Sequence, residues 1–338
     1  MSQIIPNGQV KATASASTVL ANILSSVAAP LTSVNELLIH QIESSDDILR
    51  ERLNQSGIAS GKRMRPALLL LSGACFGDIK KTHVAAAAAV ELVHVATLVH
   101  DDVLDQADER RHGESVNARW DNTTSILTGD FLFSKAFEVG CQSGSLEAMR
   151  QIATASCNVC KGEITQNALS GNFGIDEQQY FEIISLKTAE LCRCACGLGA
   201  MLSECDEASI EEFENFGTNL GIAFQIIDDV LDIVGKKDCV GKTLGTDLIN
   251  KKATLPTIHC LANMPKDQRQ KWIKKLESGD WQLVDVLEQM ESSGSIEYSR
   301  QTARQHANMA LQFTETLESS VYSESLRRLA EFVLERTF

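Results

Sequence analysis

Apolar residues recur at helical spacing along almost the whole of this chain, and this pattern constrains its fold more than any other feature. In the segment 31–54, Leu31, Val34, Leu38 and Ile42 repeat every three or four positions with polar residues between them, which is typical of an amphipathic helix. No alternating strand pattern of useful length occurs, and proline, which breaks helices, accounts for only 5 of the 338 residues. We therefore expect an all-α protein, with helices at 31–54, 66–76, 84–104, 122–140, 145–169, 176–203, 208–234, 254–262, 266–277, 280–292, 295–318 and 322–335.

The N-terminal segment differs from the rest of the chain. Residues 1–18 are small and polar and lack the long apolar stretch of a secretory signal, so we expect a short disordered leader. After it, the breaks between predicted helices carry Gly, Asn, Ser or Asp, as turns do, and none resembles a linker. Residues 19–338 are therefore predicted to form a single all-α domain.

The charge balance excludes some kinds of partner. The chain has 45 acidic and 31 basic residues, a formal net charge of -14, so general nucleic-acid binding, which needs a basic face, is not expected. No apolar run reaches the roughly 18 residues of a membrane-spanning helix. We expect a cytoplasmic protein without a transmembrane segment.

The ten cysteines do not complete a metal site in the sequence. Cys157-x-x-Cys160 has half of a zinc-binding spacing, but no second Cys-x-x-Cys or His-x-x-x-His accompanies it. Disulfides are not expected in a reducing cytosol. We interpret the cysteines as small structural residues of the core.

A repeated acidic motif is the strongest indication of function. The sequence Asp-Asp-Val-Leu-Asp occurs at 101–105 and again at 228–232, each time at the end of a long apolar segment. Asp101 and Asp105 are four residues apart, so they lie on one helix face about 6 Å apart along the axis. Crowded carboxylates repel each other unless a cation lies between them, and Mg²⁺ fits because it combines one or two carboxylates with water and substrate phosphate. A solvated acidic helix end is the alternative, and the repetition after two apolar helices makes it the weaker one.

Local concentrations of basic residues stand out in this acidic chain. They occur in Gly-Lys-Arg-Met-Arg-Pro at 61–66, in the pair Arg110 and Arg111, at Lys187, and in the lysines of the segment 236–252. Such clusters favour diphosphate binding. Together with two metal-binding motifs, they indicate a substrate that is anionic at one end and apolar at the other.

The chain resembles the trans-isoprenyl diphosphate synthases over roughly residues 30–338, and in particular the long-chain type such as octaprenyl and solanesyl diphosphate synthases. The resemblance lies in the following segments: GKRMRP at 61–66, ELVHVATLVHDDVLDQADERR at 91–111, GDFLFSKAF at 129–137, GEITQ at 162–166, Lys187-Thr188, FQIIDDVLD at 224–232 and GKTLGTDLINKKATLP at 241–256. It implies a helical bundle around a deep central cavity, with the two acidic motifs facing each other.

The resemblance also implies roles for individual residues. Three Mg²⁺ ions would be held chiefly by Asp101, Asp105 and Asp228, supported by Asp102, Asp229 and Asp232. The allylic diphosphate would be bound by Arg110, Lys187 and Lys242. Isopentenyl diphosphate would be bound by Lys62, Arg65, His94 and Arg111, with an ordinary core histidine as the alternative for His94. Thr188 and Gln225 would lie near the forming carbocation. Lys252 matches a diphosphate-binding lysine, but the family commonly has Gly-Lys where this chain has Lys251-Lys252, so either lysine could reach the site.

The activity implied is a prenyltransferase that condenses isopentenyl diphosphate with an allylic diphosphate in successive head-to-tail (1'-4) steps. The product would run along the helix that precedes Asp101, past Thr97, Ala96, Val93, Leu92 and Ala89. Short-chain members carry aromatic residues at the positions matching Ala96 or Thr97, and here the small stripe extends for about 18 Å at 1.5 Å per residue. We therefore expect an all-trans product of about C35–C50. Close helix packing is the alternative explanation for the small residues.

Other functions remain to be weighed. A short-chain synthase would share all the motifs, whereas a class I terpene cyclase usually lacks the second aspartate motif and the GKxxRP cluster. A non-catalytic subunit typically loses the aspartates, and all six are present here. A helper subunit is compatible with the sequence. By resemblance we expect a homodimer, with membrane-assisted release of its apolar product.

Overall fold

Helices of very different lengths make up almost the entire fold. The computed structural model describes residues 16–110, 113–235 and 244–335. Within these residues the only strands are β1 (Glu109–Arg110) and β2 (Gly113–Glu114), an antiparallel pair. The expectation of an all-α protein is confirmed. The helical elements are α1 (Ala16–Ile23), the 3₁₀ helix η1 (Leu24–Val27), α2 (Ala28–Glu43), α3 (Asp47–Gln55), α4 (Met64–Ala74), α5 (Lys81–Leu104), α6 (Val116–Arg119), α7 (Asn122–Cys141), α8 (Leu146–Ala168), α9 (Glu177–Ile184), the π-helix η2 (Ser185–Ala189), α10 (Glu190–Leu202), α11 (Glu207–Val234), α13 (Thr246–Ile249), α14 (Leu255–Ala262), α15 (Lys266–Ser278), α16 (Leu283–Ser292), α17 (Ser295–Thr316) and α18 (Val321–Glu335).

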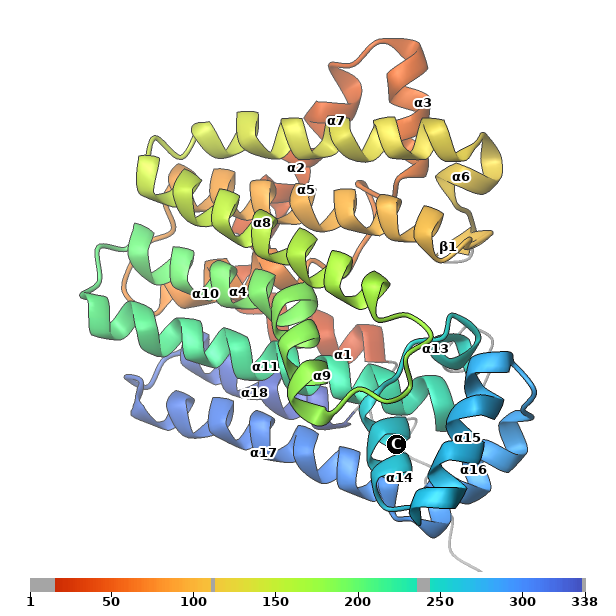
Figure 1. The fold of residues 1–338 in the computed structure, drawn as a ribbon. Helices are drawn as coiled ribbons and strands as arrows, with labels where there is room; N and C mark the ends of the chain where they lie inside the picture. Colours follow the sequence, from red (N-terminus) through yellow and green to blue (C-terminus); the bar gives the residue numbers. More distant parts are fainter. Residues whose placement is uncertain (1–15, 111–112, 236–243, 336–338) are drawn as a thin grey trace, which may run out of the picture.

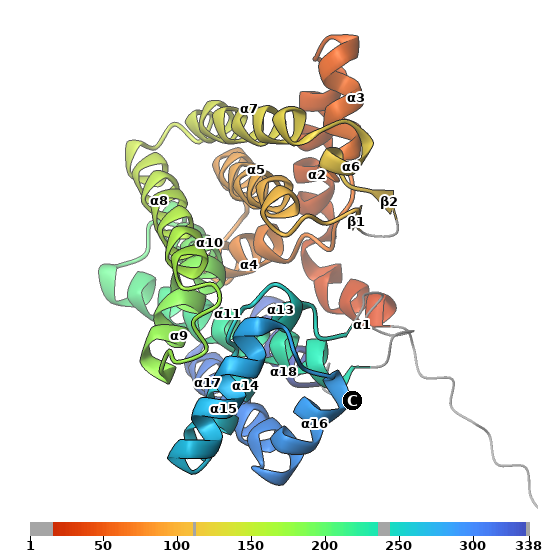
Figure 2. The same ribbon diagram turned by 45° about the vertical axis from the view of Figure 1, so that its right-hand side comes forward.

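Helix α5 lies in the middle of one half of the molecule. It packs against α2, α4, α7 and α10 (Figures 1 and 2), and its alanines at 85–89 are buried. Small side chains allow neighbouring helices to approach α5 from several sides. By length and composition alone α5 could cross a membrane, although we expected no such helix; 72% of its apolar window is buried inside the fold.

Helix α11 occupies the corresponding position in the other half. It packs against α10 and α17, and glycine makes the first contact possible: a Cβ at Gly217 would lie 2.4 Å from the carbonyl oxygen of Cys192. The C-terminal end of α11 enters a second apolar cluster formed with α14, α15 and α16, which includes Ile233, Leu276 and Met290. In Figure 1, α5 and α11 both end on the right-hand side of the view, near α13.

The structure departs from the expected helices in several places. The segment 31–54 is two helices, because the carboxylate of Asp46 accepts a hydrogen bond from the backbone N–H of Leu49 and begins α3 there. The segment 176–203 contains the π-helix η2 between two α-helices. The short elements α6 and α13 and the hairpin were not expected. Helix α1 begins at Ala16, inside the range assigned to the leader.

The cysteines are free thiols in the described part of the chain. Cys192, Cys194, Cys196 and Cys260 are buried, as core residues should be. In contrast, three cysteines are exposed: Cys141 at the end of α7, and Cys157 and Cys160 on α8. The interpretation as core residues is wrong for these three.

Candidate active site

The first acidic motif ends helix α5. Asp105 caps the helix and Gln106 adopts a left-handed conformation (φ 50°), while the N–H of Ala107 bonds to the carbonyl oxygen of Asp102. This is a Schellman arrangement, which stops the helix directly after the motif. The Asp102 side chain is buried, whereas Asp101 and Asp105 are half-buried.

Charge is crowded around Asp101. Burial raises the pKa of this carboxyl to about 6; Lys187 opposes the increase, and the carboxylates Glu163 and Asp105 add to it. Asp105 accepts a hydrogen bond from Lys252 Nζ at 2.7 Å. The free protein thus holds an excess of negative charge at the end of α5, which a cation would relieve.

The second acidic motif lies on α11, and its three aspartates have different surroundings. Asp229 is buried, and its two oxygens accept hydrogen bonds from Tyr180 and Gln225, each at 2.7 Å. Asp232 accepts from the backbone N–H groups of Thr246 (3.2 Å) and Asp247 (3.0 Å) at the start of α13. Asp228 is half-buried. Asp229 and Asp232 therefore orient neighbouring parts of the protein.

Lys187 reaches the first motif from the π-helix η2. Its Nζ donates to Gln166 Oε1 at 2.9 Å and forms an ion pair with Glu163. Burial lowers the pKa of Lys187, but Asp101 and Glu163 outweigh this effect and raise it. Glycine at 162 permits the approach of α8, since a Cβ there would lie 2.7 Å from the backbone nitrogen of Lys187. Next to Lys187, Thr188 donates to Gln225 Oε1 at 2.7 Å.

The two consecutive lysines after α13 point in different directions. Lys252 contacts Asp105, whereas Lys251 has a left-handed backbone (φ 54°) and donates to the carbonyl oxygen of Glu277, at 3.0 Å. Lys252 is thus the lysine that reaches the motif. Close by, burial and the neighbouring Asp232 raise the pKa of Asp247 to about 7, so this aspartate belongs to the same acidic group.

The basic segment 61–66, which leads into α4, contains one buried structural cation, Arg63, and two more accessible ones, Lys62 and Arg65. Arg63 is buried and donates to Asn35 (2.7 Å), to Glu91 (2.9 Å) and to the carbonyl oxygen of Ile58 (2.6 Å). It adopts a left-handed backbone (φ 52°). Lys62 is exposed, and Arg65 is half-buried with a buried Nε that has no hydrogen-bond partner. Such an unsatisfied donor fits an anionic ligand.

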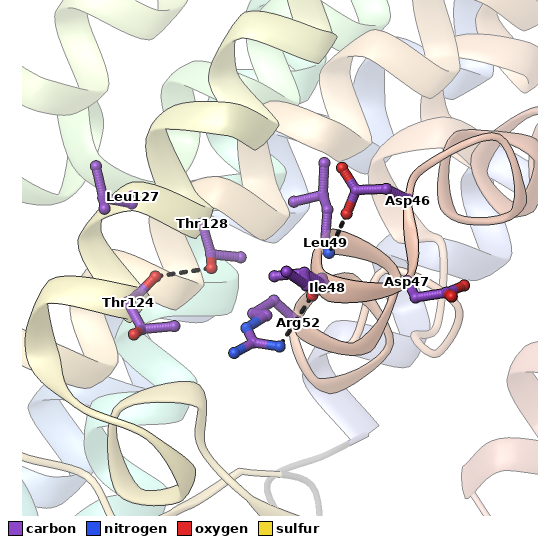
Figure 3. Close-up of a pocket in the computed structure, with 8 residues that line it drawn as sticks. All are labelled: Asp46, Asp47, Ile48, Leu49, Arg52, Thr124, Leu127 and Thr128. Atoms are coloured by element: carbon purple, nitrogen blue, oxygen red, sulfur yellow. Dashed lines mark hydrogen bonds between the residues drawn. The ribbon is translucent and has the colours of Figure 1, made fainter.

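A cavity of about 270 Å³ lies beside the first motif. Its lining includes Asp105, Glu163, Gln166, Asn250 and Lys252, so it joins the end of α5, α8 and the segment that follows α13. A larger cavity, of about 470 Å³, lies between α3 and the beginning of α7 (Figure 3). Its lining contains no residue of either acidic motif, and the smaller cavity is therefore the candidate active site.

The donor chemistry fits Mg²⁺. Within 16–110, 113–235 and 244–335, no three His, Cys, Asp or Glu side chains converge on a ready-made metal site. Mg²⁺ does not require one, because it takes one or two carboxylates and fills its remaining positions with water and substrate phosphate. The half-buried, charge-crowded carboxylates of Asp101 and Asp105 are suited to this role.

The predicted chain-length residues lie along α5. Ala89, Leu92, Val93 and Ala96 are completely buried, and Thr97 is half-buried. A Cβ at Gly140 of α7 would lie 3.4 Å from the Cβ of Ala89, so close helix packing accounts for the small residue at that position.

Some predicted residues cannot be placed, and others were missed. Arg111 and Lys242 lie outside the described residues, as does the side chain of Arg110; His94 is half-buried on α5. Glu163 and Gln166 were not predicted as site residues, although the segment GEITQ contains both. Tyr180 and Asp247 were also missed. Tyr180 lies outside every segment of the resemblance, whereas Asp247 lies within the segment 241–256; both are recognised by their contacts with the second motif.

Comparisons with known proteins give matches over most of the chain. The sequence model of the polyprenyl synthetase family matches residues 46–291. The chain is 36% identical to a short chain isoprenyl diphosphate synthase of Methanothermobacter thermautotrophicus over 87% of this chain and 93% of that protein. It is 32% identical to the octaprenyl diphosphate synthase of Escherichia coli, over 90% of this chain and 95% of that protein. A solved structure of a polyprenyl synthase from Caulobacter crescentus, complexed with calcium and isoprenyl diphosphate, superposes with a TM-score of 0.86 at 31% identity and covers 95% of this chain and 98% of its own.

Proposed function

The chain belongs to the polyprenyl synthetase family and is a trans-prenyltransferase that makes prenyl diphosphates; from this premise we propose that it is a long-chain synthase with an all-trans product of about C35–C50. The acidic cavity at which the two halves of the fold meet supports the prenyl transfer itself, and the small, non-aromatic side chains of Ala96 and Thr97 before Asp101 support the product length. Lys252, 147 residues away from Asp105 in the chain, contacts it at this cavity, and Lys187 lies against the same motif.

Three Mg²⁺ ions are proposed, held chiefly by Asp101, Asp105 and Asp228. Asp102, Asp229 and Asp232 support these ligands, the last two by orienting Gln225 and the start of α13. When bound, Mg²⁺ supplies positive charge that stabilises the departing diphosphate. The calcium in the Caulobacter crescentus structure is a divalent cation of the same hard, oxygen-binding type.

The two substrates bind through different cations. We assign the allylic diphosphate to Lys187 and Lys252, with Arg110 and Lys242 completing the set. Isopentenyl diphosphate is assigned to Lys62, Arg65, His94 and Arg111, and the unsatisfied Nε of Arg65 supports this assignment. Arg63 anchors the segment between Lys62 and Arg65 by its buried ion pair with Glu91.

The reaction then follows from charge. The bond between the allylic carbon and the diphosphate oxygen breaks, and its electron pair leaves with the diphosphate. The double bond of isopentenyl diphosphate attacks the allylic cation, and the proton released from the new intermediate goes to the departed diphosphate. Side-chain oxygens of Thr188 and Gln225 lie beside Lys187, where they can face the cation.

The whole protein is proposed to act as a cytoplasmic homodimer. Exposed apolar side chains on α7 and α8, among them Leu127 and Ile164, support a contact with a second copy. Membrane-assisted release is proposed for the apolar product. A relative in Bacillus subtilis is named component 2 of a heptaprenyl diphosphate synthase, so a helper subunit is the second arrangement to test.

Product length tests the proposal directly. The purified protein is incubated with isopentenyl diphosphate, farnesyl diphosphate and Mg²⁺, and the products are measured by mass spectrometry. A ladder that ends at about C35–C50 is expected. A product of farnesyl or geranylgeranyl length would keep the reaction and reject the long-chain assignment. Failure to elongate any allylic primer would contradict the proposed activity of the isolated chain.

A further inference from the structure

Four side chains from three elements form a hydrogen-bonded chain beside the second acidic motif. Thr188 Oγ1 of η2 donates to Gln225 Oε1, and Gln225 Nε2 donates to Asp229 Oδ1. Tyr180 OH of α9 donates to the other oxygen, Asp229 Oδ2. Each of the three donor–acceptor distances is 2.7 Å. Tyr180 is 3% exposed and Asp229 is 4% exposed. Hydrogen bonds in such a buried network are strong and hold their members rigidly.

The direction of each hydrogen bond follows from the chemistry of the groups. The NH₂ of Gln225 faces Asp229 and its carbonyl oxygen faces Thr188; an ionised Asp229, which only accepts hydrogen bonds, favours this orientation. The hydroxyl hydrogen of Thr188 is then engaged by Gln225. Beyond these bonds, the oxygens of Thr188 and Gln225 keep lone pairs for a further neighbour, and the Gln225 amide keeps its second N–H on the side of Asp229.

Lone pairs and N–H groups have opposite effects on a nearby carbocation. An oxygen that faces the cation stabilises it, whereas an amide NH₂ that faces it presents partial positive charge and destabilises it. The orientation of the Gln225 amide therefore matters for ionisation of the allylic substrate. Asp229 sets this orientation, and Tyr180 holds Asp229 by its other oxygen.

We propose that Tyr180 is a positioning residue for the prenyl transfer, acting through Asp229 and Gln225 to keep side-chain oxygens directed at the allylic cation. The inference rests on the proposed function. Tyr180 itself is separated from the cation by Asp229 and Gln225, and its ring packs edge-on against Phe181. Its effect appears when the allylic carbon–oxygen bond breaks and lasts until the new carbon–carbon bond forms.

The test removes one hydroxyl group and keeps the ring. Tyr180→Phe should lower kcat by about 5- to 10-fold, the effect of one hydrogen bond, and leave the KM of both substrates and the Mg²⁺ concentration for half-maximal activity unchanged. Tyr298→Phe is the matched control, because Tyr298 OH also donates to a carboxylate, Glu177 Oε2 at 2.8 Å, away from the motifs. This control should keep wild-type kcat.

A double-mutant cycle separates positioning from general destabilisation. Gln225→Met removes the amide through which Tyr180 acts, so the double variant Tyr180→Phe/Gln225→Met should have the kcat of Gln225→Met alone. The inference would be overturned if the loss of kcat in the double variant equalled the product of the losses in the two single variants. It would also be overturned by a folded Tyr180→Phe variant with wild-type kcat.

A second variant tests the inference if Tyr180→Phe does not fold. Asp229→Asn has the same shape, but its NH₂ can donate to Gln225, which reverses the preferred amide orientation. It should lower kcat further than Tyr180→Phe, at unchanged KM and at an unchanged Mg²⁺ concentration for half-maximal activity, which separates amide orientation from the metal support assigned to Asp229. Wild-type kcat, or a loss that disappears at high Mg²⁺, would contradict the inference. An inactive wild-type protein would instead contradict the proposed function, on which the inference rests.

Discussion

Lys251 and Lys252 are neighbours in the chain, yet they serve different parts of the molecule. The Lys252 ammonium lies 2.7 Å from Asp105, and that of Lys251 is bonded to the end of α15, at the carbonyl oxygen of Glu277. The left-handed backbone at Lys251 turns the chain between them. Sequence alone left both lysines as candidates, because both have the right charge.

Exchanging each lysine for alanine separates their roles. Lys252→Ala should reduce kcat by about 100-fold, as expected when a cation that stabilises a departing diphosphate is lost. Lys251→Ala provides the control and should retain nearly wild-type kcat. Steady-state kinetics of both variants decide the matter: equal losses, or a larger loss in Lys251→Ala, would reverse the assignment.

The acidic group makes the metal-free protein sensitive to pH. The pKa of Asp101 is raised from 3.8 to about 6 in the folded protein, so the folded state binds more protons than the unfolded state between these values. Stability from this group therefore falls as pH rises from about 4 to about 7. Asp101→Asn should raise Tm in EDTA at about pH 8, with a smaller difference at about pH 4. Thermal melts at both pH values test this, and a lower Tm of the variant at the higher pH would contradict it.

Among the secondary-structure elements, the π-helix η2 has the greatest influence on the site. It places Lys187 and Thr188 beside the two motifs, and α8 approaches it closely at Gly162. The sequence pattern predicts a helix here, but it cannot reveal the π-turn, since this depends on how α8, α9 and α11 pack against the segment.

Adding one methyl group at this contact should displace η2. In Gly162→Ala the new Cβ would lie 2.7 Å from the backbone nitrogen of Lys187, and overpacking of this kind costs about 1–3 kcal/mol. We expect a lower Tm together with reduced kcat. Gly174→Ala is the milder control, because its Cβ would meet a single side-chain atom, Asn172 Oδ1, at 3.1 Å and no backbone atom. Calorimetry and initial rates test the pair; wild-type values for Gly162→Ala would show that the contact is not constraining.

Product length is a property of the whole molecule, because it depends on the space between α5 and its neighbours. Ala96→Phe should place a ring one turn and a half before Asp101 and shorten the product to about C15–C20. Leu98→Phe places the same ring on another face of α5 and should leave the product length unchanged. Mass spectrometry of both products is the measurement, and an unchanged product from Ala96→Phe would favour helix packing as the role of the small residues.

The periodic apolar pattern and the two acidic motifs were sufficient to predict the helical fold and the kind of chemistry, because both are local properties of the chain. Helix spacing places Asp101 and Asp105 on one face without reference to any other element. The repeated acidic motif and the segment GKRMRP could likewise be recognised from short stretches of consecutive residues.

The partners of these residues depend on contacts between distant segments. Tyr180 and Asp229 are 49 residues apart, and Lys252 and Asp105 are 147 residues apart. Packing of α9 and α13 against α11 determines that Asp229 holds Gln225 and that Asp232 holds the start of α13. No local pattern contains this information, since the same Asp-Asp-Val-Leu-Asp sequence is surrounded by different side chains at the ends of α5 and α11.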